Sequence, residues 1–427
     1  MPPAVPPPPN IATAKVRRRL IPILFLVYIV AYLDRINVGF AALQMNQALG
    51  FSATVYGLGA GIFFLGYVLF EIPSNVILAR VGARIWIARI MISWGLVSAA
   101  TMFVRTAGGF YTLRFLLGAA EAGFFPGIIY YLTRWFPPRE RAQTVAAFMT
   151  ATLAAGIVGG PISGAILSMH GASGLAGWQW LFLLEGIPAV VLGVAVLRVL
   201  PDGPADARWL TDAERAAIEA GLRDVAAGDA SHAHTLTAAL TSGRLWLLSI
   251  VYFTIPVALY GTGFFLPQIV KASSGAGDFT VGVLTAVPYL VGAAGMIVVG
   301  RHSDRTGERR WHVAGSAIVG GAAFALAAAA NGTAMSLALL SIAMLGIASM
   351  FGPFWSLATS FVSGVGAAAG IALVNSVGNV GGFVGPYVLG WLKDATGSYA
   401  AGLAAIGAVL ACGGALVLCV RDERRSG

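Results

Sequence analysis

The sequence is poor in charged residues, and this scarcity excludes most soluble proteins. Only 11% of its 427 residues are Asp, Glu, Lys or Arg, against about 25% in an average globular chain, whereas 58% are hydrophobic. A soluble protein of this size needs more polar surface to cover its core. The composition therefore excludes an ordinary soluble enzyme and a disordered protein, and it indicates a chain that folds in the lipid bilayer.

Cysteine, histidine and the usual catalytic patterns are scarce as well. The two cysteines, Cys412 and Cys419, lie in the last apolar run, so no disulfide framework is expected. The five histidines lie outside the apolar runs or at their edges, without the spacing of a metal site or of a nucleophile with its base. No glycine-rich loop ending in Lys indicates ATP binding. We therefore expect neither a membrane enzyme nor an ATP-driven pump, and no metal or cofactor.

The apolar residues form twelve runs that are long enough to cross a membrane as helices. A spanning helix needs about 20 apolar residues, so roughly 248 such residues suffice for about twelve helices. The runs cover 20–43, 55–78, 85–104, 109–133, 142–169, 178–200, 245–270, 279–300, 311–330, 335–361, 370–392 and 399–420. The sequence therefore predicts an all-α membrane protein with twelve transmembrane helices.

The positions of Lys and Arg predict how these helices are oriented. Three of the 27 basic residues lie on the side opposite the N-terminus and three lie within the runs: Arg105, Lys271 and Lys393, and Arg35, Arg89 and Arg114. The other 21 lie on the side of the N-terminus, and cytoplasmic loops are the ones enriched in Lys and Arg. Both termini are therefore expected in the cytoplasm. The net charge of +9 is explained by this topology and requires no nucleic-acid partner.

Two motifs recur at an offset of 225 residues. The second run ends in Ala79-Arg-Val-Gly82 and the eighth in Asp304-Arg-Thr-Gly307, and Gly160-Pro161 of the fifth run recurs as Gly385-Pro386 in the eleventh. Two unrelated motifs at one offset indicate two pseudo-repeats of six helices. Transporters with parallel six-helix repeats bind their substrate near the membrane midplane, between the repeats.

This organisation predicts five segments along the chain. They are a disordered, Pro-rich cytoplasmic N-terminus (1–19), a first six-helix bundle (20–200), a cytoplasmic linker (201–244), a second six-helix bundle (245–420) and a cytoplasmic tail (421–427). Within the linker, Thr211 and Glu214 form a capping-box pattern, which predicts a short amphipathic helix beginning near Asp212.

The duplicated motif resembles the signature of the major facilitator superfamily. Motifs of the first half resemble, more specifically, its anion:cation symporter branch: Tyr32-Leu-Asp34-Arg35-Ile-Asn37, Glu71-Ile-Pro73-Ser74-Asn75, Arg114 to Pro126, Arg134-Trp-Phe-Pro137 and Trp178 to Pro188. The similarity extends from about Lys15 to Arg421. This branch, typified by bacterial galactonate, tartrate and phthalate permeases, transports organic anions, commonly together with protons.

One position departs from the superfamily pattern. Ala79 stands where the first copy of the signature usually has Asp, so a gating salt bridge there is expected to be weak or absent. The second copy is intact, and the resemblance assigns gating to Asp304, Arg305 and Gly307.

Four ionisable residues within the first and fourth runs are the candidates for chemistry, because an ionised side chain at the bilayer centre costs about 2.5–3.5 kcal/mol. Arg35 and Arg114 offer planar forks that match a carboxylate, so they are the expected anion ligands. Glu121, two helical turns beyond Arg114, is the expected proton carrier. Asp34 is the second candidate, in a switchable ion pair with Arg35 or Arg114. The alternative is a static ion-pair network that joins the two helices.

The second half lacks counterparts of these charges. The positions 225 residues after Asp34, Arg35 and Glu121 hold Leu259, Tyr260 and Gly346, so this half is expected to contact neutral parts of the substrate. Resemblance to the permeases implies further substrate contacts at Tyr32, Tyr67, Thr152, Trp355 and Asn375. For each of these aromatic or hydroxyl side chains taken alone, helix packing explains the residue equally well.

Two further acidic residues and a glycine run have expected structural roles. Glu71 and Glu185 are placed near inner ends of runs, where we expect them to pair with basic loops, with a role in transport as the alternative. Gly156, Gly159, Gly160 and Gly164 fit close packing between helices that rock.

The sequence thus predicts a secondary active transporter that imports a small organic anion with a proton, by alternating access across the bacterial inner membrane. An exchanger or exporter of similar anions is the alternative. The expected substrate is a carboxylate such as a sugar acid, tartrate or an aromatic acid. The chain is expected to work as a monomer, with the co-transported proton in place of a cofactor.

Overall fold

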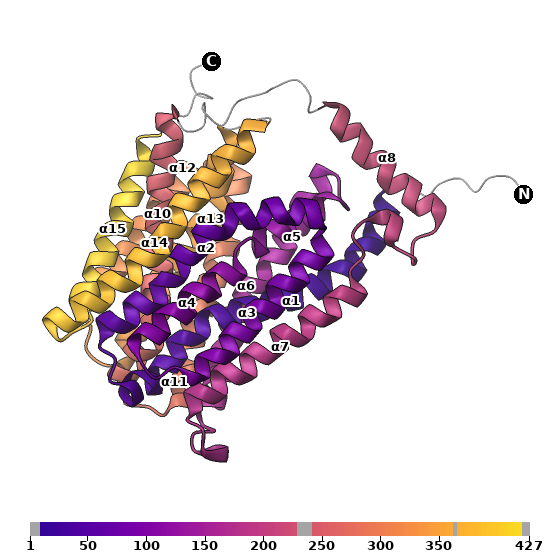
Figure 1. Cartoon of the computed structure of the whole chain (residues 1–427). Coiled ribbons are helices and arrows are strands. Elements are labelled where there is room, and N and C mark those ends of the chain that lie inside the picture. Colours follow the sequence, from indigo (N-terminus) through magenta and orange to yellow (C-terminus); the bar gives the residue numbers. More distant parts are fainter. Residues whose placement is uncertain (1–8, 229–240, 362–364, 421–427) are drawn as a thin grey trace, which may run out of the picture.

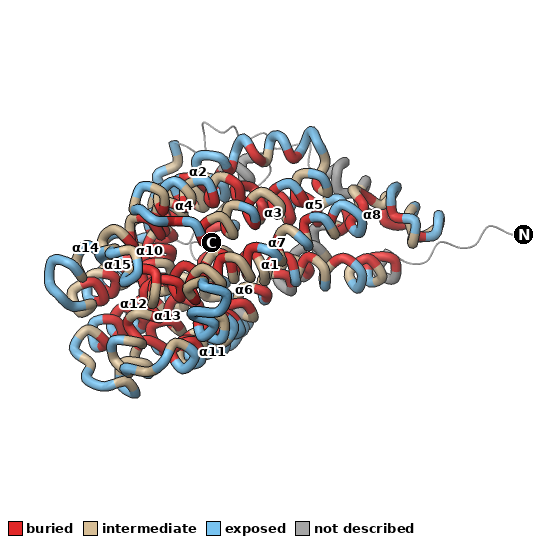
Figure 2. Tube along the Cα trace, turned by 60° about the horizontal axis from the view of Figure 1, so that its bottom comes forward, coloured by how far each residue is buried: buried red, intermediate tan, exposed pale blue. Residues whose placement is uncertain are grey.

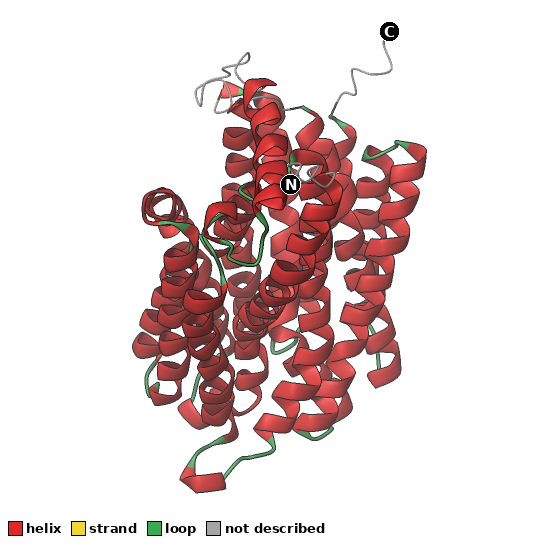
Figure 3. Cartoon of the chain, turned by 90° about the vertical axis from the view of Figure 1, so that its right-hand side faces the viewer, coloured by secondary structure: helices red, strands yellow, loops and turns green. Residues whose placement is uncertain are grey.

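A computed structural model describes residues 9–228, 241–361 and 365–420, and in these ranges the chain forms helices joined by short loops (Figure 1, Figure 3). Twelve of the described segments are long and apolar enough to cross a membrane. The predicted all-α class with twelve spans is therefore confirmed. The predicted residues 1–8 of the N-terminal segment and the tail 421–427 lie outside the described residues.

The helices follow the predicted runs closely. The first half contains α1 (Pro9–Leu49), α2 (Ala53–Val81), α3 (Ala83–Ala100), α4 (Ala107–Glu121), α5 (Phe124–Thr133), α6 (Pro138–Leu167) and α7 (Gly177–Val199). The linker contains α8 (Asp212–Gly228). The second half contains α10 (Gly243–Ser274), α11 (Asp278–Thr306), α12 (Arg310–Ala328), α13 (Thr333–Ser360), α14 (Val365–Thr396) and α15 (Ala400–Leu418). Three short 3₁₀ turns, at Thr101–Phe103, Ala172–Gly174 and Pro204–Asp206, lie in the connections.

The outer surface of the helix bundle is apolar, as the sequence composition requires. In Figure 2 the buried residues lie mainly in the interior of the bundle and the exposed residues mainly on its outside. Large apolar side chains such as Leu69, Ile72 and Val298 are among the exposed ones. Helices satisfy their own backbone hydrogen bonds, so their sides can face lipid without unpaired polar groups.

The fourth predicted span is interrupted, which the sequence analysis did not foresee. Helix α4 ends at Glu121, and α5 begins only at Phe124. Between them Gly123 adopts φ +83°, and a Cβ at this position would lie 2.4 Å from the hydroxyl of Ser74. Glycine is thus required here by both the backbone conformation and the neighbouring helix. The Ser74 hydroxyl donates to the carbonyl of Ala122 (2.6 Å), which stabilises the break.

The first helix is longer than predicted. Helix α1 begins at Pro9, so residues 9–19 are helical and the expectation of disorder over them is wrong. The extension packs against the linker: Lys15 forms an ion pair with Glu214 (2.7 Å), and the guanidinium of Arg19 lies over the ring of Trp209. Contacts with the linker, both within α8 and just before it, therefore help to hold this segment as a helix.

The linker helix α8 begins at Asp212, as the capping-box pattern predicts. The amide of Glu214 donates to the Thr211 hydroxyl (3.2 Å) and the amide of Thr211 donates to the Glu214 carboxylate (2.9 Å). Lys15 and the Thr211 amide together lower the pKa of Glu214 below its usual value. Helix α8 lies beside the start of α1, away from the second half (Figure 1).

The two halves pack along two long contacts, of α2 with α14 and of α6 with α11. In the second contact a Cβ added to Gly160 would lie 2.2 Å from the carbonyl oxygen of Gly282, and the converse holds for Gly282. The glycine run in the fifth span thus permits backbones of the two halves to touch, in agreement with the close packing predicted for it.

Hydrogen bonds between the halves are concentrated at one end of the bundle. Near this end Gln44 donates to Asp278 (2.7 Å) and Asn46 donates to Gln268 (3.3 Å). Asp394 of α14 accepts the amides of the first two residues of α2, Ala53 and Thr54, at 3.1 and 2.7 Å. The N-terminus of α2 is therefore capped partly by the other half of the molecule.

Candidate substrate and proton site

Arg35 contacts two of the other predicted site residues, Glu121 and Tyr67. It forms an ion pair with Glu121, and its Nη1 donates to the hydroxyl of Tyr260 (3.3 Å). Its guanidinium also faces the rings of Phe63 and Tyr67, at 5.4 and 5.6 Å. The Arg35 side chain is 13% exposed and that of Glu121 is 3% exposed, so the arginine is the more accessible partner of this buried pair.

Arg35 and Tyr260 occupy equivalent positions in the two repeats. They are 225 residues apart, which is the offset of the duplicated motifs. Equivalent residues of two repeats related by a two-fold axis can touch only near that axis. Their hydrogen bond therefore places Arg35 close to the pseudo-two-fold axis, between the halves, where a substrate of this fold is expected.

Glu121 owes its position to the interruption between α4 and α5. It is the last residue of α4, so its carboxylate lies at the negative end of that helix's dipole, an unfavourable place for a negative charge. The Arg35 guanidinium offsets this cost. This ion pair joins α1 to α4, so the structure contains one link of the ion-pair network that the sequence analysis gave as the alternative.

Asp34 faces away from this pair. Its Oδ1 accepts hydrogen bonds from Ser98 of α3 and from Asn37 (3.0 Å), and its Oδ2 has no hydrogen-bond partner. Among the described residues no basic side chain lies within ion-pair distance of Asp34. The expected ion pair with Arg35 or Arg114 is therefore absent from this structure, since Asp34 lies inside the first bundle.

Arg114 is also buried apart from Arg35. Only 1% of the residue is exposed, and its Nη2 donates to the carbonyl of Ala60 at 3.4 Å. Its guanidinium lies 5.1 Å from the ring of Phe63, which also contacts Arg35. Its Nε and Nη1 have no hydrogen-bond partner. Phe63 thus links the two predicted anion ligands, but the structure does not bring Arg114 into the pair formed by Arg35 and Glu121.

The other residues expected to contact the substrate lie on several helices of both halves. Asn375 reaches across from α14 and donates to Oε1 of Glu71 (3.3 Å). Trp355 packs against the ring of Tyr252 (4.9 Å). Tyr32 packs with Ile36 and Ala155, and the Thr152 hydroxyl donates to the Met149 carbonyl of its own helix. Tyr67 alone of these residues contacts Arg35 directly.

The expected pairing of Glu71 and Glu185 with basic loops is wrong. Glu71 is buried and accepts its hydrogen bond from Asn375 of the other half. Glu185 is buried inside the first bundle, nearer the Gly177 end of α7, and accepts a hydrogen bond from Ser163 of α6 at 2.9 Å. Amide and hydroxyl donors take the place of the expected cations because both carboxylates lie too deep for loop residues to reach.

The two copies of the duplicated loop motif are stabilised differently. In the second copy Asp304 pairs with Arg309 (2.7 Å), Arg305 is exposed, and Gly307 ends α11 with φ +68°. In the first copy, where Ala79 replaces the aspartate, Arg84 pairs with Asp202 (3.3 Å) and its amide donates to the same carboxylate (2.9 Å).

The first loop therefore does have a carboxylate, supplied by the segment after α7. The expectation of a weak or absent gating salt bridge at Ala79 stays a prediction, because the Arg84–Asp202 pair is partly exposed and does not join the two halves. Sequence reasoning missed Asp202. The available signal was an acidic residue two positions beyond the sixth run, in a half whose motif lacks one.

Comparisons with known proteins agree with this architecture. Residues 24–386 match the model of the Major Facilitator Superfamily. A protein of Agrobacterium vitis named as a tartrate transporter is 51% identical over 95% of this chain and 90% of its own length. The metabolite transport protein NicT of Pseudomonas putida is 45% identical over 91% and 90%. The chain belongs to the major facilitator superfamily.

The solved structures of other superfamily members show the same fold. A bacterial homologue of the human lysosomal transporter Spinster, in an inward-facing and occupied conformation, superposes with a TM-score of 0.78 at 18% identity and covers 95% of this chain and 96% of its own. The resemblance to an anion:cation symporter type of permease is confirmed by the named relatives. This superfamily member is a transporter and not an enzyme.

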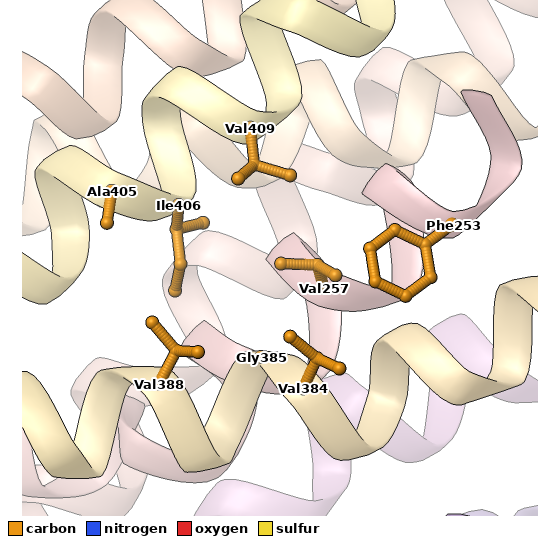
Figure 4. A pocket seen from close by; sticks show the side chains of 8 residues that line it. All are labelled: Phe253, Val257, Val384, Gly385, Val388, Ala405, Ile406 and Val409. Carbon is orange, nitrogen blue, oxygen red and sulfur yellow. The ribbon is translucent and has the colours of Figure 1, made fainter. Parts of the chain in front are cut away.

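A hollow elsewhere in the transporter does not serve the site. It lies between α10, α14 and α15 and is lined by apolar side chains and one glycine: Phe253, Val257, Val384, Gly385, Val388, Ala405, Ile406 and Val409 (Figure 4). A carboxylate would find no polar side chain there. The candidate site for an anion is therefore the group of polar side chains around Arg35.

Proposed function

We propose that this transporter imports a small organic anion together with a proton, and that the Arg35–Glu121 ion pair couples the two. The pair is buried between the halves and close to the pseudo-two-fold axis, and this observation carries the proposal. Arg35 supplies the fork that binds the substrate carboxylate, and Glu121 carries the proton.

Coupling follows from competition for one guanidinium. When the substrate carboxylate binds Arg35, Glu121 loses its partner and is left as a buried, uncompensated charge, which costs about 3–5 kcal/mol. Proton uptake by Glu121 removes that cost. Anion and proton therefore bind together, and Arg35 is neutralised in both states of the cycle, by Glu121 or by the substrate.

The predicted topology indicates which side of the membrane each end of the bundle faces. If both termini are cytoplasmic, the end at which Asp394 caps α2 faces outward, and its hydrogen bonds close the outer side. In the proposed cycle the opposite, cytoplasmic side is the one at which anion and proton are released. In this proposal the chain works in the bacterial inner membrane as a monomer, by alternating access.

The proposed cargo is a carboxylate, because Arg35 is matched to one. The relatives named for tartrate transport support this class. Sugar acids and aromatic acids share the carboxylate that Arg35 would bind. An exchanger of the same anions would use Arg35 in the same way, but it would not need protonation of Glu121.

The Glu121→Gln variant tests the coupling. In proteoliposomes a gradient of one pH unit supports about tenfold accumulation of a labelled carboxylate for each coupled proton. We expect the variant to lose this accumulation but to retain exchange of internal for external anion, since Gln cannot carry the proton. Glu140→Gln is the matched control, because Glu140 pairs with Arg17 (3.6 Å) and takes no part in the Arg35–Glu121 pair. Unchanged accumulation in Glu121→Gln would remove Glu121 from the mechanism.

A further inference from the structure

Glu71 has no part in the proton cycle described above, yet it lies beside it. It is 7% exposed, and its Oε1 accepts a hydrogen bond from Asn375 of the opposite half at 3.3 Å. Glu71 follows Tyr67 by four positions on α2, so the two side chains share a face of that helix. Because the Tyr67 ring faces Arg35, this face of α2 leads from the Arg35 guanidinium to the Glu71 carboxylate.

The surroundings of Glu71 leave its negative charge weakly compensated. Among the described residues no Lys or Arg lies within ion-pair distance of it, and the cation that acts on it through space, Arg35, is paired with Glu121. A carboxylate is costly to bury without a partner of its own. One amide donor from the other half satisfies part of its hydrogen-bonding capacity, and the carboxylate can accept more donors.

The spacing between Arg35 and Glu71 suits a small, hydroxylated acid. The Arg35 guanidinium faces the rings of Phe63 and Tyr67, and Glu71 follows these residues by eight and four positions, which is about 6–12 Å along α2. A ligand whose carboxylate binds Arg35 would extend along the Tyr67 ring and bring its next few carbon atoms to Glu71 and Asn375. An ionised carboxylate there accepts hydrogen bonds, and an amide both donates and accepts them.

We propose that Glu71 and Asn375 form a subsite for hydroxyl groups of the substrate, so that the transporter selects hydroxy acids over carboxylates whose remaining part is a hydrocarbon. This inference rests on the proposed function, because it takes Arg35 as the carboxylate ligand. A hydrocarbon at this position would leave the Glu71 carboxylate without the hydroxyl donors that it can accept. Sites built to bind a hydroxyl reject the analogue that lacks it far more strongly than apolar pockets reject an added group.

The experiment measures selectivity rather than transport alone. Binding of L-tartrate, malate, succinate, benzoate and phthalate to the purified, full-length transporter is followed by calorimetry. Malate and succinate differ by one hydroxyl. We expect wild-type protein to bind malate at least tenfold more tightly than succinate, and the aromatic acids to bind no more tightly than succinate.

The variants separate the subsite from the fold. In Glu71→Ala the preference for malate over succinate is expected to fall below threefold. Glu71→Gln keeps the shape and one acceptor oxygen but loses the charge-assisted hydrogen bond, so its preference is expected to lie between these values. Glu185→Gln, which alters another buried carboxylate of the first half, is expected to keep the wild-type preference.

Three results would overturn the proposal. These are equal binding of malate and succinate by the wild type, tighter binding of an aromatic acid than of the hydroxy acids, and a preference that is unchanged in both Glu71 variants. Loss of proton coupling with an intact, Glu71-dependent preference would instead refute the proposed function alone. If no carboxylate bound, both proposals would fall.

Discussion

The two halves of the transporter share a helix plan but contribute opposite chemistry to the space between them. The first half supplies the ion pair of Arg35 and Glu121 and the carboxylate of Glu71. The second half supplies the phenol of Tyr260 and the amide of Asn375. Duplication has therefore preserved the fold while the charges were confined to one copy.

This division separates strong interactions from weak ones. Breaking a buried ion pair costs about 3–5 kcal/mol, whereas a hydrogen bond contributes about 0.5–1.5 kcal/mol between neutral groups and about 1.5–3 kcal/mol where one group is charged. Because both members of the ion pair belong to the first half, rocking of the halves does not have to break it. The hydrogen bonds that rocking must break, such as Arg35–Tyr260 and Asn46–Gln268, are individually weaker.

Among substitutions of the charged residues of the first half, Arg35→Lys is expected to weaken carboxylate binding the most. An ammonium cannot reproduce the planar fork toward Glu121 or a carboxylate, so we expect carboxylate binding to weaken by at least 100-fold. Arg114→Lys is the comparison variant. Because Arg114 is buried behind Phe63, its effect on binding should be clearly smaller, although the sequence alone predicts equal losses. Calorimetric titration of both variants checks this order, and equal losses would mean that Arg114 reaches the substrate in another state.

Tyr260→Phe would test the neutral side of the comparison. It removes one hydrogen bond of 3.3 Å to Arg35 and leaves the ring contacts with Phe64 and Phe264 in place. We expect carboxylate affinity to fall by about 2- to 10-fold, with proton-driven accumulation retained. If Tyr260→Phe lost as much carboxylate affinity as Arg35→Lys, the second half would contribute as much to carboxylate binding as the charged residues of the first half.

Asp202→Ala addresses the difference between the two loop motifs and should have the smallest effect. The Arg84–Asp202 pair is partly exposed, and such pairs contribute about 0–1 kcal/mol. We expect transport rates to fall by less than fivefold. Adding Ala79→Asp, which restores the superfamily residue, is expected to recover the rate. If the double variant were no faster than Asp202→Ala, Asp202 would not be a substitute for the missing aspartate.

Much of the fold and part of the site follow from the sequence. Long apolar runs determine the helices, since only they can satisfy backbone groups in lipid. The separation of Asp34 from Arg35 also follows in principle, because neighbouring residues of a helix point about 100° apart and cannot both face one cavity. Asp34 accordingly accepts hydrogen bonds from Asn37 and Ser98 inside the first bundle, and the ion pair expected for it is absent.

Other features depend on contacts between distant segments. The break after Glu121 requires Ser74 to donate to Ala122 and leaves space only for glycine at 123. In a segment with several glycines, the sequence does not reveal which one will take a positive φ. Likewise, residues 9–19 read as disordered because their helix depends on packing against Trp209 and Glu214, about 200 residues away.

The aspartate that caps α2 from the opposite half also sets a thermodynamic property of the resting transporter. Separating the halves at that end would break the hydrogen bonds from the amides of Ala53 and Thr54 to Asp394. Loss of such a cap costs about 0.5–2 kcal/mol. This corresponds to about a 2- to 30-fold excess of the closed form from this contact alone. A ligand that binds the open form only modestly better than the closed form can reverse a bias of that size. Even a weakly bound substrate can therefore shift the equilibrium between the closed and open forms.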